Sequence, residues 1–88
     1  MDKELIKKIT KIALQNAYEH GGKTQDKIVL GKILGSSPEY RSKVKEIAKD
    51  ISKIVNSVNQ LSSEEQEKEI NKSFPELLTP KEKIDPKY

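Results

Sequence analysis

The chain has 88 residues, of which 33% are hydrophobic and 35% are charged, and its formal net charge is +3. This length predicts one small domain, and the absence of cysteine excludes disulfide bonds and thiolate zinc sites. No apolar run approaches the roughly 18 residues that span a bilayer, and the first residues lack the pattern of a secretory signal, so we expect a cytoplasmic protein without membrane contact.

Apolar residues recur with helical spacing over residues 2–19, which predicts a first, long helix. The negative charge of Asp2 interacts favourably with the positive N-terminal end of this helix. The pair Gly21-Gly22 ends the helix because glycine readily adopts left-handed backbone geometry. The side chains expected on its apolar arc are Leu5, Ile6, Ile9, Ile12, Ala13 and Ala17.

A second, short helix is predicted over residues 25–34, with Thr24 as its N-cap and Gly35 at its end. Gly31 within it costs about 1 kcal/mol relative to alanine, which indicates close approach by a neighbouring helix. The helix's own apolar side chains lie on nearly all sides of its axis, so we expect it at the buried centre of the domain. They are Ile28, Val29, Leu30, Ile33 and Leu34.

A third helix is predicted over residues 38–58, opened by Ser37 as cap and Pro38 in the first turn. Its amphipathic pattern is the strongest in the chain. The apolar arc holds Tyr40, Val44, Ile47, Ala48, Ile51, Ile54, Val55 and Val58.

A fourth, short and polar helix follows, with Ile70 and Phe74 as its inward anchors and Pro75 ending it. Two overlapping capping boxes are possible at its start, Ser62 with Glu65 and Ser63 with Gln66.

Residues 79–88 hold two prolines and five charges and predict a loose tail or linker. No hairpin signal or internal repeat occurs. The predicted fold is therefore all-α: a small four-helix array of two long and two short helices in residues 1–78, with a loose C-terminal tail.

Recognisable catalytic and metal-binding constellations are absent from the sequence. His20 is the single histidine, and its place beside a Gly-Gly helix end favours a capping or surface role. The run Gly21-Gly22-Lys23-Thr24 lacks the first glycine and the preceding strand of a phosphate-binding loop. We expect no catalytic residue and no metal site in this chain.

Lysines gather on the expected outer faces. Residues 1–60 carry a charge of +5 and residues 61–88 a charge of −2, which favours an anionic partner such as RNA for the first part. Tyrosine beside lysine permits base stacking together with phosphate binding. A solvated surface is the alternative. Three groups of candidate RNA-binding residues follow, the first of which is Lys7, Lys8, Lys11, Gln15 and Tyr18 on the first helix. The second is Lys23, Lys27 and Lys32 around the start of the second helix, where backbone N–H groups attract phosphate. The third is a row of Arg41, Lys45, Lys49 and Lys53 on the third helix.

Asn16 lies in the middle of the apolar arc of the first helix. A buried amide needs hydrogen-bond partners, because leaving it without them costs roughly 1–3 kcal/mol. We expect a structural role, in which Asn16 bonds the backbone near residues 21–24 or the end of the second helix and fixes the interhelical angle. Ligand binding is the alternative.

Several short segments, taken together and in order, resemble the N-terminal appended domain of archaeal-type glutamyl-tRNA synthetases, which is itself similar to the N-terminal region of eukaryotic glutaminyl-tRNA synthetases. The segments are Ala13-Leu14-Gln15-Asn16-Ala17, Gly22-Lys23, Gly31-Lys32 with Leu34-Gly35, Pro38-Glu39 with Arg41, and residues 61–78 with their end Phe74-Pro75-Glu76-Leu77-Leu78.

This resemblance implies a non-catalytic domain that precedes a class I catalytic domain, with residues 79–88 as the linker. The parent enzyme would join glutamate to its tRNA with ATP and magnesium. The class I signatures His-Ile-Gly-His and Lys-Met-Ser-Lys are absent from this chain. We expect a monomer whose partner is tRNA.

Two other functions stay open. One is a docking module for a synthetase or amidotransferase assembly, in which Leu14, Leu77 and Leu78 form an exposed apolar patch. The other is a spacer that orients the catalytic domain. Neither the tRNA nucleotides contacted nor a protein partner follows from the sequence.

Overall fold

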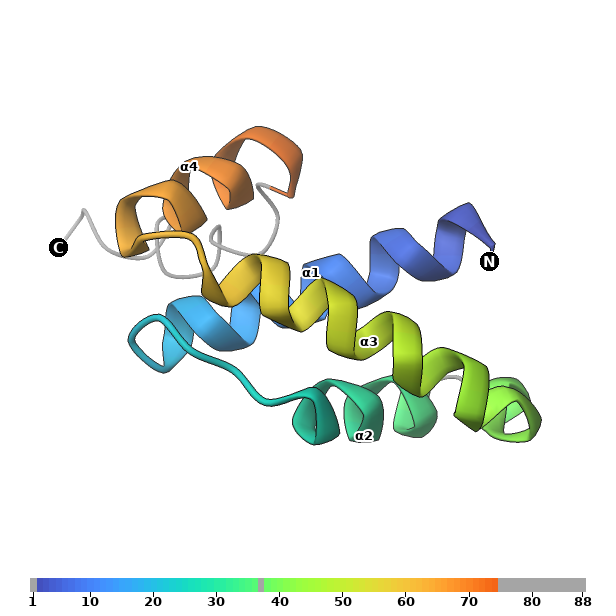
Figure 1. Cartoon of the computed structure of the whole chain (residues 1–88). Coiled ribbons are helices and arrows are strands. Elements are labelled where there is room, and N and C mark those ends of the chain that lie inside the picture. The colour runs from blue at the N-terminus through green and yellow to red at the C-terminus, as the bar shows by residue number, and fades with distance from the viewer. Residues whose placement is uncertain (1, 37, 75–88) are drawn as a thin grey trace, which may run out of the picture.

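The computed structural model describes residues 2–36 and 38–74, and in these residues every regular element is helical (Figure 1). The prediction of an all-α array with two long and two short helices is confirmed. The expected tail, the capping role of Ser37 and the leucines at 77 and 78 lie outside the described residues. The elements are α1 (Lys3–Glu19), α2 (Asp26–Ser36), the 3-10 helix η1 (Pro38–Lys43), α3 (Val44–Asn59) and α4 (Ser63–Ser73).

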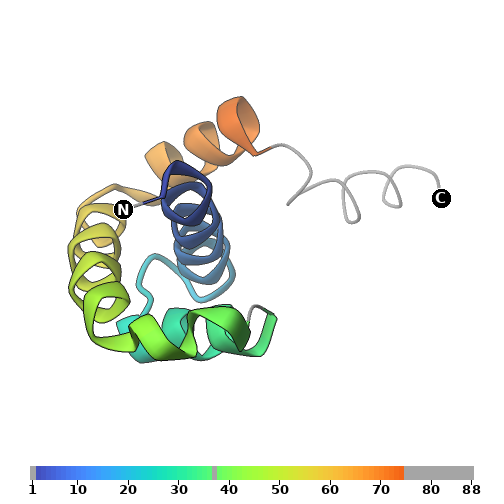
Figure 2. The ribbon, with the colours of Figure 1, turned by 90° about the vertical axis from the view of Figure 1, so that its right-hand side faces the viewer.

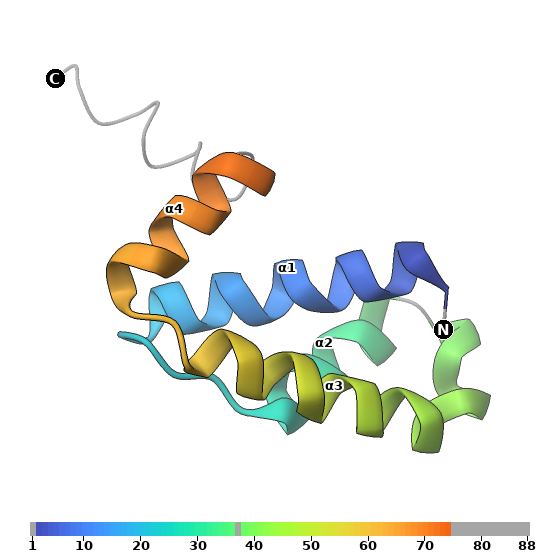
Figure 3. The same cartoon turned by 45° about the horizontal axis from the view of Figure 1, so that its top comes forward.

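The long helices α1 and α3 lie side by side and run in the same direction (Figure 3). α2, which comes between them in the sequence, runs in the opposite direction (Figure 3). Viewed at right angles, α2 crosses one side of this pair and α4 crosses the other (Figure 2). α1 contacts each of the other three α-helices and is therefore the centre of the fold.

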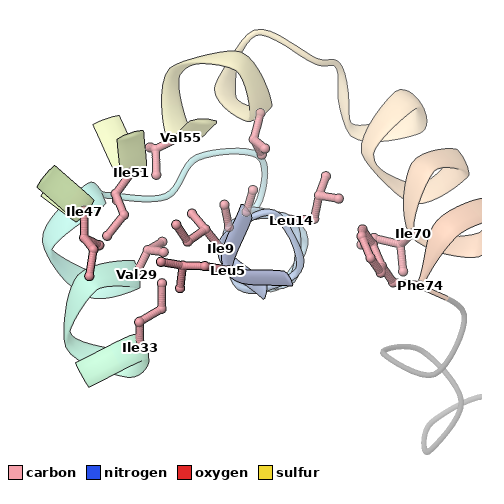
Figure 4. Packing of buried hydrophobic residues seen from close by; sticks show 13 residues of the cluster. Leu5, Ile9, Leu14, Val29, Ile33, Ile47, Ile51, Val55, Ile70 and Phe74 are labelled. Atoms are coloured by element: carbon pink, nitrogen blue, oxygen red, sulfur yellow. The ribbon is translucent and has the colours of Figure 1, made fainter. Parts of the chain in front are cut away.

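The core consists of thirteen buried apolar side chains that α1, α2, α3 and α4 contribute together (Figure 4). The predicted arcs of the first and third helices supply most of them, although Ile6 is 39% exposed. The members are Leu5, Ile9, Ala13, Leu14, Ala17, Val29, Ile33, Ile47, Ile51, Val55, Val58, Ile70 and Phe74.

Leu14 is 1% exposed, and it points to the side of α1 where Ile70 and Phe74 of α4 lie (Figure 4). The interpretation of Leu14 as part of an exposed docking patch is therefore wrong. Leu14 lies off the main apolar arc of α1, and it is buried nevertheless because α4 covers this helix on a second side.

The prediction that the second helix forms the buried centre is also wrong. Only Val29 and Ile33 are buried in α2, whereas Ile28 is 39% exposed. Among the described residues, no heavy atom outside the adjoining backbone of α2 lies within 4 Å of a Cβ placed on Gly31, so none of the described helices approaches it closely. Because α2 lies against one side of the α1–α3 pair, a single stripe of its surface is covered.

The bounds of α2 differ from the predicted ones at both ends. The helix begins at Asp26, where the carbonyl of Gln25 accepts the N–H groups of Ile28 and Val29 at 3.1 and 3.2 Å. Thr24 is not its cap, since its buried hydroxyl has no hydrogen-bond partner among the described residues. α2 continues through Gly35 to Ser36.

The first residues of the predicted third helix form the 3-10 helix η1, and α3 begins only at Val44. Tight 3-10 turns are frequent at the N-termini of α-helices. Lys43 at the boundary makes no side-chain capping hydrogen bond. The amphipathic arc of residues 44–58 is confirmed, with Ile47 and Ile51 buried in it.

The start of α4 forms one of the two predicted capping boxes. Ser62 Oγ accepts the N–H of Glu65 at 3.2 Å, and Glu65 Oε1 accepts the N–H of Ser62 at 2.8 Å. The second box does not form, because Gln66 is 1% exposed and turns into the molecule. Ile70 and Phe74 are buried, as predicted.

The loop between α1 and α2 is held by side chains from the end of α3 and the start of α4. Asn59 Oδ1 accepts the N–H of Thr24 at 2.9 Å, and Asn59 Nδ2 donates to the carbonyl of Thr24 at 3.0 Å. Gln66 Nε2 donates to the carbonyls of Gly22 and Val58 at 3.0 and 3.2 Å. The side-chain amides of Asn59 and Gln66 therefore attach the loop to α3 and to α4.

Asn16 is buried, as predicted, but its expected partner is wrong. Its Nδ2 donates to the carbonyl of Ile12 at 2.9 Å, within α1. The loop after α1 instead turns through Gly21 and Gly22, whose φ angles are +80° and +119°. The interhelical fastening that we expected from Asn16 is thus provided by Asn59.

Candidate nucleic-acid interface

Lys7, Lys8 and Lys11 of α1 line hollows that are shared with α2, with η1 and with the end of α4. Lys7 is exposed and Lys8 and Lys11 are half-buried. Tyr18 at the far end of this surface packs partly against the core. The three lysines therefore share one surface of α1, whereas Tyr18 is half-buried and lines neither hollow.

Lys32 of α2 joins this surface. A pocket of about 270 Å³ between α1 and α2 is lined by Lys8, Lys11, Ile12, Gln15, Asn16 and Lys32. Lysines from two helices thus converge on one hollow, and their like charges favour a bound anion. Lys32 lies well inside α2 rather than around its start, which is why the sequence spacing alone assigned it to another group.

A second hollow, of about 630 Å³, continues the surface towards η1 and the end of α4. Lys7, Lys8 and Lys11 line it together with acids, since Glu4 and Glu39 lie in its wall. Lys11 Nζ lies 5.8 Å from the ring centroid of Phe74. Such a cation–π contact stabilises by about 0.5–1 kcal/mol at exposed sites and ties the end of α4 to α1.

The predicted row on the third helix is shortened by η1. Arg41 lies in η1, so only Lys45, Lys49 and Lys53 follow one another on α3. All four side chains are exposed.

Acids lie beside this row. Lys49 and Lys53 line a hollow of about 350 Å³ that also holds Asp2, Glu46 and Asp50. Acids therefore lie beside the lysines of this row. Among the described residues, no acid lines the pocket between α1 and α2, although its Lys8 and Lys11 also line the hollow that holds Glu4 and Glu39.

The predicted group around the start of the second helix does not come together as one site. Lys23 and Lys27 are exposed near that start, while Lys32 faces α1. The first turn of α2 also carries Asp26, whose Oδ2 accepts the hydroxyl of Ser52 at 2.7 Å. This carboxylate places negative charge where we expected a phosphate.

Gln15, which the sequence analysis placed on the same face of the first helix as Lys11, is a further residue of this pocket. It lines the pocket between α1 and α2, and its Nε2 donates to Glu19 Oε2. Its position beside Lys11 on the α1 face was a usable signal. The missing information was the direction of α2, which brings Lys32 opposite.

The arrangement defines a small, basic, all-α helical domain in which lysines of α1 and α2 converge on one pocket. Within residues 2–36 and 38–74, no three His, Cys, Asp or Glu side chains gather as metal ligands do. None of the helices in those ranges is long and apolar enough to cross a membrane.

Curated relatives of this domain are glutamate–tRNA ligases. The chain is 67% identical over 85 residues to the glutamate–tRNA ligase of Nitrosopumilus maritimus (strain SCM1), which covers 97% of this chain and 15% of that ligase. It is 48% identical over 83 residues to that of Sulfurisphaera tokodaii, covering 94% and 15%. It is also 48% identical over 87 residues to that of Pyrococcus furiosus, covering 96% and 15%.

The chain is thus homologous to a segment of glutamate–tRNA ligases, and it spans about 15% of the length of the curated relatives cited above. This confirms the resemblance that the sequence motifs indicated, and the matched share is consistent with an N-terminal domain. No family model and no solved structure matches the chain.

Proposed function

We propose that this chain is the N-terminal domain of a glutamate–tRNA ligase and that it helps to bind the tRNA to which glutamate is attached. The assignment to such an enzyme is supported by the relatives of this chain, which are glutamate–tRNA ligases. These relatives are much longer than this chain, which supports a separate catalytic domain that carries out the ATP- and magnesium-dependent chemistry. Residues 79–88 would link the present domain to that catalytic domain.

The observation that carries the proposal is the convergence of Lys8, Lys11 and Lys32 on one pocket, whose lining contains no acid among the residues that the structure describes. Lysine contacts to phosphate supply affinity and position the nucleic acid without reading its sequence. Lys7 extends the same surface along α1. The α3 row is a weaker candidate because each described hollow that its lysines line also holds an acid, whereas the described lining of the α1–α2 pocket holds none.

Binding by this surface depends strongly on salt. Each lysine–phosphate contact contributes about 0.7–0.9 to the slope of log affinity against log salt, so three contacts lower the affinity about 20- to 40-fold between about 50 and 200 mM salt. A titration of the chain with tRNA at these two salt concentrations measures the slope. Absence of binding at low salt, or an affinity that ignores salt, contradicts the proposal.

Two charge-matched variants test which surface binds. Changing Lys8, Lys11 and Lys32 to Gln removes three positive charges from the α1–α2 pocket, and changing Lys45, Lys49 and Lys53 to Gln removes three from α3. Both variants lose the same net charge, so a larger loss of affinity in the first assigns binding to the pocket. An equal loss in both indicates general attraction to a basic protein and contradicts the assignment.

Aminoacylation by the complete ligase separates this proposal from a spacer role. The first variant is expected to lower charging at limiting tRNA concentration, because the domain then holds tRNA less tightly. Unchanged charging by a folded enzyme instead supports a spacer that orients the catalytic domain.

A further inference from the structure

Gly31 lies inside α2, although the fold of the described residues does not require a glycine there. A glycine within a helix is destabilising relative to alanine. Among the described residues, positive φ angles occur at Gly21 and Gly22 but not at Gly31. Gly31 does not end the helix either, since α2 continues to Ser36, and no described helix packs closely against it. Left-handed backbone, helix termination and close helix packing therefore do not account for this glycine.

Gly31 lies on the line of α2 that faces straight away from the core. Because an α-helix has 3.6 residues per turn, Val29 and Ile33 are each turned by about 160° from Gly31, on opposite sides of it. Val29 and Ile33 are the buried residues of α2, whereas Gly31 is exposed. Gly31 is thus opposite the middle of the buried stripe, and its missing side chain opens the helix backbone to another molecule.

Two lysines border this outer line of α2. Lys27 is turned by about 40° from Gly31 on one side and Lys32 by about 100° on the other, and both are exposed. Lys27 lines a hollow of about 160 Å³ between α2 and α3, and Lys32 lines the pocket between α1 and α2. Asp26 shares the hollow of Lys27, but its carboxylate accepts the hydroxyl of Ser52 on α3. The outer face of α2 therefore has a positive charge on each edge and accessible backbone between them.

We propose that a sugar–phosphate strand of RNA lies across this outer face of α2, directly against the backbone at Gly31, with phosphates near Lys27 and Lys32. Charge complementarity favours this occupant, because lysine–phosphate contacts supply affinity and position a nucleic acid without reading its sequence. Ile28, which is 39% exposed, offers the ribose carbons an apolar surface beside Gly31. Glycine allows a ligand to approach the backbone closely, and a side chain at this position would hold the strand away from both lysines.

This inference rests on the proposed tRNA-binding function and extends it from the α1–α2 pocket to the outer face of α2. Lys32 borders both, so one strand can contact the two surfaces in succession. The inference predicts that one substitution raises the stability of the domain and lowers its affinity for tRNA. Gly31→Gln has this character, because glutamine favours a helix more than glycine does and leaves the net charge unchanged.

Titration of the 88-residue chain with labelled tRNA at low salt and urea unfolding of the same proteins test both effects. Gly31→Gln should raise the urea midpoint. It should also weaken tRNA binding about two- to tenfold, which corresponds to the loss of one hydrogen bond to phosphate. Ser57→Gln places the same side chain on an exposed position of α3 and should leave the affinity unchanged.

A second pair of variants tests the lysine edge of the face. Lys27→Gln should reduce the slope of log affinity against log salt by about 0.7–0.9, as expected for one phosphate contact. Lys68→Gln removes the same charge from an exposed position of α4 and should reduce the slope less. Equal reductions in the two variants would contradict a phosphate contact at Lys27.

Unchanged tRNA affinity of Gly31→Gln, an equal loss of affinity in Ser57→Gln, or a lowered urea midpoint of Gly31→Gln overturns the inference. If Gly31→Gln keeps its tRNA affinity but lowers the melting temperature of the complete ligase, the face contacts another part of the enzyme instead of RNA. Salt-dependent tRNA binding that tolerates Gly31→Gln removes only the contact on α2. Absence of tRNA binding by the unaltered chain at low salt removes the proposed function as well.

Discussion

Asn59→Ala is expected to destabilise the domain, because Asn59 fastens the loop between α1 and α2. Its amide makes two hydrogen bonds, at 2.9 and 3.0 Å, to the backbone N–H and carbonyl of Thr24. Thr24 is 7% exposed, so water does not readily replace the lost partners. Alanine thus removes the partners of the N–H and the carbonyl of Thr24, both of which lie in partly buried hydrogen bonds.

The size of the effect follows from these two bonds. Each contributes about 0.5–1.5 kcal/mol net, which gives about 1–3 kcal/mol for the pair. In a domain of about 60–100 residues, each kcal/mol shifts the melting temperature by about 4–8 °C. A loss of 2 kcal/mol therefore lowers the melting temperature by about 8–16 °C.

Urea and thermal unfolding followed by far-UV circular dichroism measure both quantities. Asn56→Ala is the matched control, since Asn56 is an exposed residue of the same helix and the substitution is identical. Its stability should change by less than about 0.5 kcal/mol, as for most surface substitutions. Equal stabilities of the two variants would refute the assignment of Asn59 as a fastening residue.

Three further predictions concern the packing. Gly31→Ala should stabilise the domain by up to about 1 kcal/mol, because the added Cβ meets no described atom within 4 Å outside the adjoining backbone of α2 and the backbone is helical, whereas Gly22→Ala should destabilise it because φ is +119° there; urea midpoints of the two variants test the opposite signs. Ile9→Ala should cost about 2–5 kcal/mol, since Ile9 is fully buried, while the 39% exposed Ile6 should tolerate alanine with a much smaller loss; similar losses would contradict the observed orientation of α1. Leu14→Glu should unfold the domain or severely destabilise it, because a carboxylate would replace a side chain that is 1% exposed; a melting temperature close to that of the unaltered chain would mean that Leu14 is not buried.

The cationic surface on α1 and α2 could be predicted only in part from the sequence. The helical period alone places Lys7, Lys8 and Lys11 on one face of the first helix, and the structure keeps them there. The same period cannot say that Lys32 lies opposite them, because this depends on the direction in which α2 crosses α1. The prediction of a four-residue row on the third helix is wrong for Arg41, because the chain forms a 3-10 helix before Val44.

The sequence by itself determined the features that depend on neighbouring residues in the chain. These are the apolar arcs of α1 and α3, the chain reversal at Gly21-Gly22 and the capping box of Ser62 with Glu65. Each follows from helical periodicity, from the backbone freedom of glycine or from side-chain capping over three residues. Such interactions act over a few residues, so the local sequence is sufficient to fix them.

Only the tertiary structure decided which surfaces are covered and which amides join the helices. α2 lies at the side of the α1–α3 pair although its sequence is apolar nearly all round, and α4 buries Leu14 although that residue falls off the main arc. Asn59 and Gln66 bond a loop that is 35 and 44 residues away from them. Burial and long-range hydrogen bonds depend on how whole helices cross one another, and that geometry is set by the packing of the complete core.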